Sequence, residues 1–247
     1  MKNKLVIITG ASSGIGKACA EKFAAEGANL VLAARSKEKL ADVEKQLSVF
    51  GVEVLSVVTD VSKELDCKRL MNQALSKFGR IDILVNNAGI SMRASFKDVD
   101  VEVIKRVMDV NFFGTVYCTR YAISSIIENN GSVVGVSSIA GYKGLPGRTG
   151  YSSSKFAMHG FLEALRIENI NNGLHVLIAC PGYTASNIRN SALVADGSEQ
   201  GETPREEKKM MQPEEVATYI LNAVIHRKDR LTLTLNGKLM VLLNKFF

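Results

Sequence analysis

The stretch LVIITGASSGIGKACAEKFAAEGA, residues 5–28, decides the fold. Its first five residues are apolar and mostly β-branched, which predicts a buried strand at 5–9. The glycine-rich turn GASSGIG at 10–16 follows, and the remainder carries apolar side chains at helical spacing. The order strand, glycine turn, helix offers free backbone N–H groups and a positive dipole end to a pyrophosphate. The alternative is that the glycine-rich stretch forms a turn that binds no ligand. The stretch lacks the GK[ST] ending of a P-loop, which disfavours nucleotide hydrolysis.

Strand-like and helix-like segments alternate along the rest of the chain, with no polar linker between them. We expect strands near 5–9, 29–34, 52–58, 81–86, 131–136, 174–179 and 230–235, and helices near 14–26, 37–49, 62–78, 99–128, 150–171 and 213–226. Alternation of this kind indicates βαβ units and a parallel sheet covered on both faces. Residues 1–247 therefore predict a single α/β domain, a Rossmann fold with a doubly wound, seven-stranded parallel sheet.

Composition argues against several classes of protein. No run of eighteen apolar residues occurs, so no transmembrane helix is expected. The 4 cysteines show no CxxC pairing, which indicates reduced thiols in a cytoplasmic protein, and we interpret Cys180 as a small packed residue rather than a reactive thiol. The 3 histidines lack metal-ligand spacing, so no metal is expected. The net charge of +6 is modest and its lysines are spread out, which disfavours nucleic acid as a partner.

Tyr151 and Lys155 lie four residues apart in YSSSK. Four residues is about one turn of α-helix, so the phenol and the ammonium project from one face. A nearby cation stabilises a phenolate, so Lys155 is expected to lower the pKa of Tyr151 from its reference of about 10, where the phenol becomes a general acid or base. The pattern arises often by chance. It gains weight from a hydroxyl partner, Ser138 in GVSSIAG, and from the absence of a GxSxG elbow that would make Ser138 a hydrolase nucleophile.

Further motifs stand in a fixed order along the chain. NNAG at 86–89 follows the strand-like IDILV, Asn111 lies in DVNFFGT, and CPGYTAS occupies 180–186. With TGASSGIG and YSSSK, they make the chain resemble the short-chain dehydrogenase/reductase family from about Lys4 to Ser186, and more loosely to about residue 235. The ending resembles hydroxysteroid and lipid-ketone reductases more than 3-oxoacyl carrier-protein reductases.

The resemblance implies an NADP(H) cofactor. Ala34 stands where NAD-preferring members carry an acid, and Arg35 beside it suits a 2′-phosphate, although Arg35 is alternatively a plain surface charge. Asp60 resembles the aspartate that contacts adenine, and it is also a candidate N-cap. The implied cofactor contacts are Gly10, Ser12, Ser13, Gly14, Ile15, Gly16, Arg35, Ser36, Lys39, Asp60, Val61, Asn87, Ala88, Gly89, Tyr151, Lys155, Pro181, Gly182, Thr184 and Ser186.

The resemblance also assigns catalytic roles to four residues. Ser138 is expected to bind the carbonyl or alcohol oxygen and Tyr151 to donate or remove the proton. Lys155 is expected to tune Tyr151 and hold the nicotinamide ribose, and Asn111 to hold a water that connects Lys155 to solvent. The implied reaction interconverts a ketone or aldehyde and an alcohol. For Asn111 the alternative role is to cap a helix. For the whole protein the alternative function is to sense a dinucleotide without turning over a substrate.

The substrate is less clearly indicated. Residues 187–212 are polar and aperiodic, which is typical of a substrate lid, and residues 236–247 form an apolar tail. A lipophilic carbonyl would fit an apolar pocket, and packing in the core is the alternative use of its candidate residues Met92, Leu145, Leu193, Met210 and Met211. We expect the tail to dock on a partner subunit of a homodimer or homotetramer, with peripheral membrane contact as the alternative.

Overall fold

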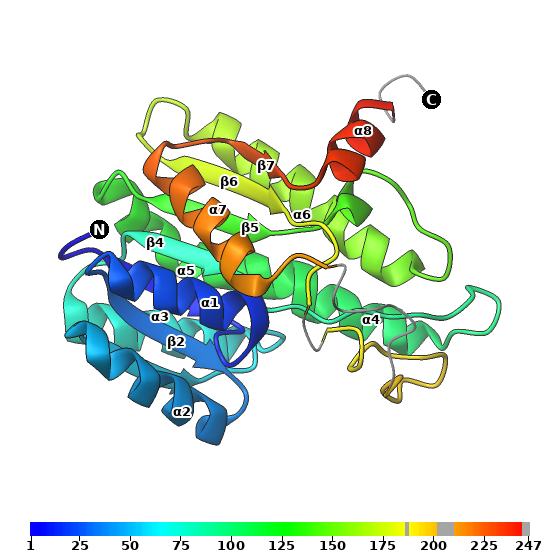
Figure 1. The fold of residues 1–247 in the computed structure, drawn as a ribbon, viewed down its shortest axis with the longest axis horizontal. Coiled ribbons are helices and arrows are strands. Elements are labelled where there is room, and N and C mark those ends of the chain that lie inside the picture. Colours follow the sequence, from blue (N-terminus) through cyan, green and yellow to red (C-terminus); the bar gives the residue numbers. More distant parts are fainter. Residues whose placement is uncertain (186–187, 202–209, 244–247) are drawn as a thin grey trace.

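Residues 1–185, 188–201 and 210–243 are described by the computed structural model of the chain. The fold is one parallel sheet of seven strands in the order β3-β2-β1-β4-β5-β6-β7 (Figure 1). Its strands are β1 (Leu5–Thr9), β2 (Asn29–Ala34), β3 (Val54–Val58), β4 (Ile83–Asn86), β5 (Ser132–Val136), β6 (His175–Cys180) and β7 (Arg230–Thr232). The doubly wound, seven-stranded sheet expected from the sequence is confirmed.

Helices cover both faces of the sheet (Figure 1). The α-helices among the described residues are α1 (Gly14–Ala25), α2 (Lys37–Leu47), α3 (Glu64–Phe78), α4 (Val101–Met108), α5 (Gly114–Glu128), α6 (Thr149–Glu168), α7 (Pro213–Ile225) and α8 (Leu235–Leu243), of which α8 lies beyond the end of β7. Side chains alternate along each strand, so Ile8 and Leu32 pack in one core with α1, α2 and α7. Their neighbours Ile7 and Val31 pack in the other core, with α3, α5 and α6. No helix among the described residues is long and apolar enough to cross a membrane.

Two expected boundaries are wrong. The helix expected at 99–128 is interrupted by a π-helical turn at Asp109–Phe113, so that α4 and α5 are separate elements. The last strand ends at Thr232 rather than at 235, because Thr234 adopts a left-handed φ of 71°. The Thr234 hydroxyl then accepts a hydrogen bond from the Gly237 N–H at 3.2 Å, and this contact begins α8 in what the sequence suggested was only a tail.

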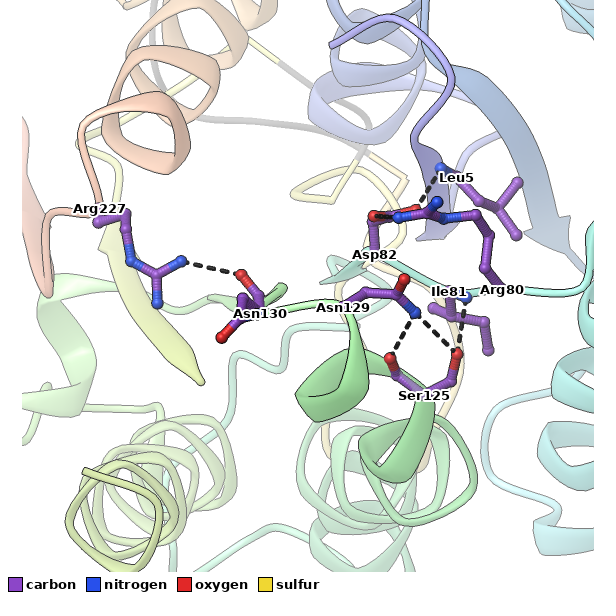
Figure 2. A network of polar contacts seen from close by, with 8 residues as sticks. All are labelled: Leu5, Arg80, Ile81, Asp82, Ser125, Asn129, Asn130 and Arg227. Atoms are coloured by element: carbon purple, nitrogen blue, oxygen red, sulfur yellow. Dashed lines mark hydrogen bonds and ion pairs between the residues drawn. The ribbon is translucent and has the colours of Figure 1, made fainter. Parts of the chain in front are cut away.

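A network of polar contacts closes the amino end of the sheet (Figure 2). The carboxylate of Asp82 is fully buried and accepts a hydrogen bond from the Leu5 N–H at 2.9 Å. The Arg80 guanidinium holds both oxygens of this carboxylate, at 2.8 and 2.6 Å. Farther along the same edge, the Arg227 guanidinium donates to the carbonyl oxygen of Asn130 at 2.9 Å. These contacts fix the strands at the end opposite to the motif residues.

Replacing Asp82 tests this network. Asp82→Ala leaves the buried Leu5 N–H without an acceptor and is expected to lower the free energy of unfolding by ~3 kcal/mol. Denaturant unfolding measures the change. The matched control is Glu102→Ala, which removes an ion pair with Lys105 whose side chains are 73% and 64% exposed, and it is expected to cost less than ~0.5 kcal/mol. Equal losses in the two variants would contradict the role of Asp82.

Candidate active site

The glycine turn after β1 lies in close contact with the turn after β4. Gly10 and Gly14 adopt left-handed φ angles of 65° and 53°, which favour glycine. A Cβ at Gly10 would lie 2.9 Å from both the Ala88 Cα and the Asn87 Nδ2. The Asn87 amide nitrogen Nδ2 donates to the Thr9 carbonyl at 2.9 Å and to the Gly10 carbonyl at 3.2 Å. The motifs TGASSGIG and NNAG are therefore joined directly.

A cleft of about 660 Å³ follows the carboxyl ends of these strands. Most of the residues that the sequence expected at a cofactor line it, namely Gly10, Ser12, Ser13, Gly14, Ile15, Arg35, Ser36, Lys39, Asp60, Val61, Asn87, Ala88 and Gly89. Ile90, Val110, Ile188, Asn190, Ser191, Glu199 and Gly201 also line it and were missed. Ile90 directly follows NNAG and its position was a usable signal, whereas the residues near 190–200 carry no motif.

The remaining expected cofactor residues lie elsewhere. Of the described residues, Gly16, Tyr151, Lys155, Pro181, Gly182 and Thr184 do not line the cleft, and Ser186 lies outside the described residues. Gly16 packs α1 onto the turn, because a Cβ there would clash with the Gly10 carbonyl. Gly182 faces the chain after β7, where a Cβ would lie 2.5 Å from the Thr234 Cγ2.

The far end of the cleft carries cations and one carboxylate. Arg35 and Lys39 are exposed and line it where β2 ends, and Ser36 caps α2 by accepting from the Lys39 N–H at 3.2 Å. The alternative that Asp60 caps the next helix is wrong, because α3 begins at Glu64. Asp60 instead accepts from the backbone N–H and the hydroxyl of Ser62, at 3.1 and 2.7 Å. The cradle, its N–H groups and these cations fit the phosphates of a dinucleotide.

Asn111 bridges two segments from inside the π-helical turn. It is fully buried, and its amide exchanges hydrogen bonds with the Ile90 backbone, at 2.8 Å from the N–H and 3.0 Å to the carbonyl. Its Nδ2 also donates to the Ser154 hydroxyl at 2.9 Å. The capping alternative is therefore wrong, since Asn111 ties the loop after β4 to α6. π-Helical turns are frequent at functional sites.

Tyr151 and Lys155 both lie on α6, as the spacing predicted. The Lys155 Nζ lies 5.8 Å from the centroid of the Tyr151 ring and donates to the Val136 carbonyl at 3.0 Å. Lys155 is 3% exposed, and burial lowers the pKa of its ammonium to about 8. The buried ammonium thus titrates near neutral pH.

The pKa of Tyr151 differs from the expectation. Burial of the phenol is the largest effect and raises its pKa, while the hydrogen bond with Ser138 and the charge of Arg148 oppose the rise. The expected lowering by Lys155 is wrong for this structure, because the ammonium donates to Val136 and burial disfavours its own charge. Ser138 is thus the hydroxyl partner of Tyr151, as the motif suggested.

The competing serine, Ser137, has a different partner. Its hydroxyl lies 2.7 Å from the His159 Nε2, and both side chains are buried. Burial first, and then the charges of Lys155 and Arg230, lower the pKa of His159 to about 4. Cys180 is fully buried 3.6 Å from the same nitrogen, and burial raises its pKa to about 12, so the interpretation as a packed residue is confirmed.

Comparison with known proteins decides the family. The family model described as short chain dehydrogenase matches residues 4–195. The chain belongs to the short-chain dehydrogenase/reductase family. Its members are oxidoreductases whose fold binds a nicotinamide dinucleotide, which agrees with the cleft.

Relatives of this short-chain dehydrogenase/reductase include hydroxysteroid dehydrogenases. It is 38% identical over 94% of its length to dehydrogenase/reductase SDR family member 7B of Xenopus tropicalis, of which it covers 77%. It is 41% identical over 75% of its length to 11-beta-hydroxysteroid dehydrogenase 1A of Arabidopsis thaliana, of which it covers 53%. The crystal structure of an alcohol dehydrogenase from the archaeon Thermococcus sibiricus, complexed with 5-hydroxy-NADP, is similar with a TM-score of 0.81 and 26% identity over 92% of this chain and 93% of that chain.

Most of the apolar residues expected to line a substrate pocket pack in the core instead, which was the alternative use. Met92 and Leu193 are buried together in a small cluster with Val103 and Val107. Met210 is buried as well, and Met211 packs against the core formed with α1 and α7. Of the five, Leu145 lines a cavity of about 250 Å³, together with Arg93, Pro146, Arg148, Tyr183, Arg189 and Gln200.

The low pKa of His159 predicts a pH dependence of stability. Its folded-state pKa of about 4 lies below the ordinary value of 6.5, so the unfolded chain binds more protons between these two values. The free energy of unfolding is therefore expected to fall as the pH falls from about 6.5 to about 4. Denaturant unfolding at several pH values in this range measures how the free energy of unfolding depends on pH. This dependence should be weaker in His159→Gln than in the parent protein, whereas His226→Gln, at an exposed position, should keep the dependence of the parent. Identical slopes in all three proteins would contradict the assignment.

Proposed function

We propose that this short-chain dehydrogenase/reductase is NADP(H)-dependent and interconverts a ketone or aldehyde and an alcohol, with Tyr151 as general acid and base. The observation that carries the proposal is the placement of the Tyr151 phenol beside the buried Lys155, whose Nζ lies 5.8 Å from the ring centroid, and near Ser138, which lowers the pKa of the phenol against the effect of burial. These residues follow β5, at the same carboxyl edge of the sheet as the strands β1 to β4 that form the dinucleotide cleft. Ligands in open α/β sheets bind at this edge.

The chain's own residues then supply position and a proton. When bound, the nicotinamide supplies or accepts the hydride. The Ser138 hydroxyl binds the substrate oxygen, where negative charge develops during reduction, and stabilises it. The Tyr151 hydroxyl gives its proton to this oxygen, or takes it in the reverse direction. The Lys155 ammonium, which titrates near neutral pH, is suited to resupply that proton and to hold the ribose.

Asn111 acts on this site through position. Its amide bonds to Ile90 and to Ser154, and the Ser154 hydroxyl donates to the Tyr151 carbonyl at 2.8 Å. This chain of contacts holds the start of α6 against the loop after β4. A Cβ at Gly89 would lie 3.2 Å from the Asn111 Oδ1 and 3.7 Å from the Lys155 Nζ, so a small residue is needed there for the approach.

NADP(H) is preferred over NAD(H) in this proposal because of the residues where β2 ends. Ala34 places no carboxylate there that would repel a 2′-phosphate, and Arg35 and Lys39 offer it cations. The solved neighbour from Thermococcus sibiricus carries a derivative of NADP, which supports the same choice.

Residues 187–212 are proposed as the substrate lid. Ile188, Asn190 and Glu199 line the dinucleotide cleft, and this supports the assignment. Residues 187 and 202–209 of the segment lie outside the described residues. A cytoplasmic location stays a prediction.

The end of the chain is proposed as a docking surface for a second subunit of a homodimer or homotetramer. Leu239, Leu242 and Leu243 of α8 are exposed, which supports such a contact, with peripheral membrane contact as the alternative. Phe246 and Phe247 lie outside the described residues.

Tyr151→Phe tests the chemistry. Removing the hydroxyl eliminates the proton donor, so kcat is expected to fall by about 10³-fold, while NADPH affinity is unchanged. Turnover is measured with a panel of carbonyl compounds by following NADPH absorbance, and Tyr219→Phe, at an exposed position on α7, is the control. Unchanged turnover in Tyr151→Phe would refute the mechanism. NADPH binding without turnover of any carbonyl by the parent protein would favour the dinucleotide-sensing alternative.

Arg35→Ala tests the cofactor. Loss of one charge-assisted contact is expected to weaken NADPH binding by about 10- to 100-fold and to leave NADH binding unchanged. Binding is measured by fluorescence titration of each cofactor. Lys37→Ala is the control, because Lys37 is an exposed cation two positions away that does not line the cleft. A parent protein that binds NADH more tightly than NADPH would overturn the assignment.

A further inference from the structure

A buried histidine of α6 contacts the segment that carries Ser138. His159 lies one helical turn after Lys155, so the two side chains project from the same face of α6. Lys155 donates a hydrogen bond to the Val136 carbonyl at 3.0 Å. The His159 Nε2 lies 2.7 Å from the hydroxyl of Ser137, and the two groups form a hydrogen bond. Two successive turns of α6 are thus bonded to the two residues that precede Ser138.

The same imidazole contacts the turn that follows Ser138. The Ser138 hydroxyl caps this 3₁₀ turn by accepting from the Ala140 N–H at 3.2 Å. A Cβ at Gly141 would lie 2.6 Å from the His159 Nε2, so the backbone of the turn packs directly against the ring. The ring of Tyr142 meets the imidazole edge to face, with the two centroids 4.6 Å apart. His159 therefore contacts the chain on both sides of Ser138.

The imidazole carries no charge near neutral pH. His159 is 7% exposed, and burial first, and then the charges of Lys155 and Arg230, lower its pKa to about 4. The Arg230 guanidinium is itself ion-paired with the carboxylate of Glu163, one turn farther along α6. A neutral imidazole keeps its hydrogen bond with Ser137 and adds no second cation beside the Lys155 ammonium.

We propose that His159 is a positioning residue, which sets the place of the Ser138 hydroxyl relative to Tyr151. It acts through Ser137 on one side of Ser138 and through the turn at Gly141 on the other. Because Tyr151 lies on the same helix as His159, these contacts hold the serine segment and the tyrosine in one register. A displacement of about 1 Å between reacting groups can lower a rate by about 10²-fold. The inference rests on the proposed function for its reaction, and it adds a residue to the same site.

His159→Leu tests the position. Leucine fills much of the space and removes the hydrogen bond with Ser137, so kcat with NADPH and a ketone is expected to fall by about 10- to 100-fold, while the Kd of NADPH is unchanged. His159→Gln keeps a polar group that can bond to the Ser137 hydroxyl and is expected to recover most of the parent kcat. An unchanged kcat in His159→Leu would refute the proposal.

The other end of the same strand offers a matched control. Where β5 and β6 begin, the Ser132 hydroxyl lies 2.9 Å from the His175 Nδ1, and both side chains are buried. His175→Leu removes a serine–histidine hydrogen bond of the same kind, and it is expected to lower the free energy of unfolding at least as much as His159→Leu does. It is expected to leave kcat unchanged. An equal fall of kcat in the two variants would reduce the role of His159 to stability and overturn the proposal.

A double-mutant cycle assigns the effect to the hydrogen bond. Ser137→Ala removes the partner of His159 and is expected to lower kcat as well. Once this bond is lost, a second substitution in the pair removes little more, so kcat of the double variant is expected to be close to that of His159→Leu alone. Losses that multiply in the double variant would contradict action through Ser137.

Crystal structures separate this proposal from the proposed function, because they need no turnover. The distance between the hydroxyls of Ser138 and Tyr151 is measured in the parent protein, His159→Leu and His175→Leu, each with NADP⁺. It is expected to increase in His159→Leu alone. Such an increase in a protein that reduces no ketone supports the position and refutes the reaction. Reduction of ketones by His159→Leu at the parent rate, with an unchanged distance, supports the reaction and refutes the position.

Discussion

The hydrogen bonds of Asn87 to the turn after β1 are the contacts on which the site depends. In the strand order β3-β2-β1-β4-β5, the chain reverses direction across the sheet between β1 and β4. A crevice forms at such a reversal because the helices that follow the two strands leave on opposite faces. The Asn87 Nδ2 spans this point by donating to the carbonyls of Thr9 and Gly10, while the Thr9 hydroxyl accepts from the N–H groups of Asn87 and Ala88, both at 3.0 Å. Gly10 is required because any side chain would separate the two turns.

Burial controls the chemistry of the neighbouring residues. Lys155 is placed almost entirely out of water and donates a hydrogen bond to the Val136 carbonyl, and burial lowers the pKa of its ammonium to about 8. The same burial raises the pKa of Tyr151, so Ser138 and Arg148 are the groups that favour its ionised form. The phenol is therefore tuned by a hydroxyl and by a guanidinium that also lines a cavity of about 250 Å³.

Much of this arrangement could be predicted from local sequence, because parallel strands and glycine turns have strong local patterns. The strands, the glycine turn after β1 and the placement of Tyr151 and Lys155 on one helix follow from local pattern and spacing, and the cleft residues of NNAG follow from the family resemblance. The π-helical turn at Asn111 could not be predicted, since it depends on the tertiary contact with Ile90 and Ser154. The direction of the Tyr151 pKa depends on burial, which spacing does not report.

The clustering of three arginines in the loops after β4, β5 and β6 could not be predicted from periodicity for a related reason. Arg93, Arg148 and Arg189 come from three loops without periodicity, and only the sheet brings those loops together. The apolar residues near them in sequence misled the expectation, because Met92 and Leu193 turn inward to a small core. Residues dispersed along a chain thus line one cavity when the ends of successive strands meet at one edge of the sheet.

Transfer of deuterium tests the account most directly. The protein is incubated with a ketone panel and NADPH that carries deuterium at the transferable position of the nicotinamide, and the product alcohol is analysed by mass spectrometry. The account predicts one deuterium on the carbinol carbon of the product, with the hydroxyl proton taken from solvent through Tyr151. Product without cofactor-derived deuterium, or no product from any ketone, would contradict it.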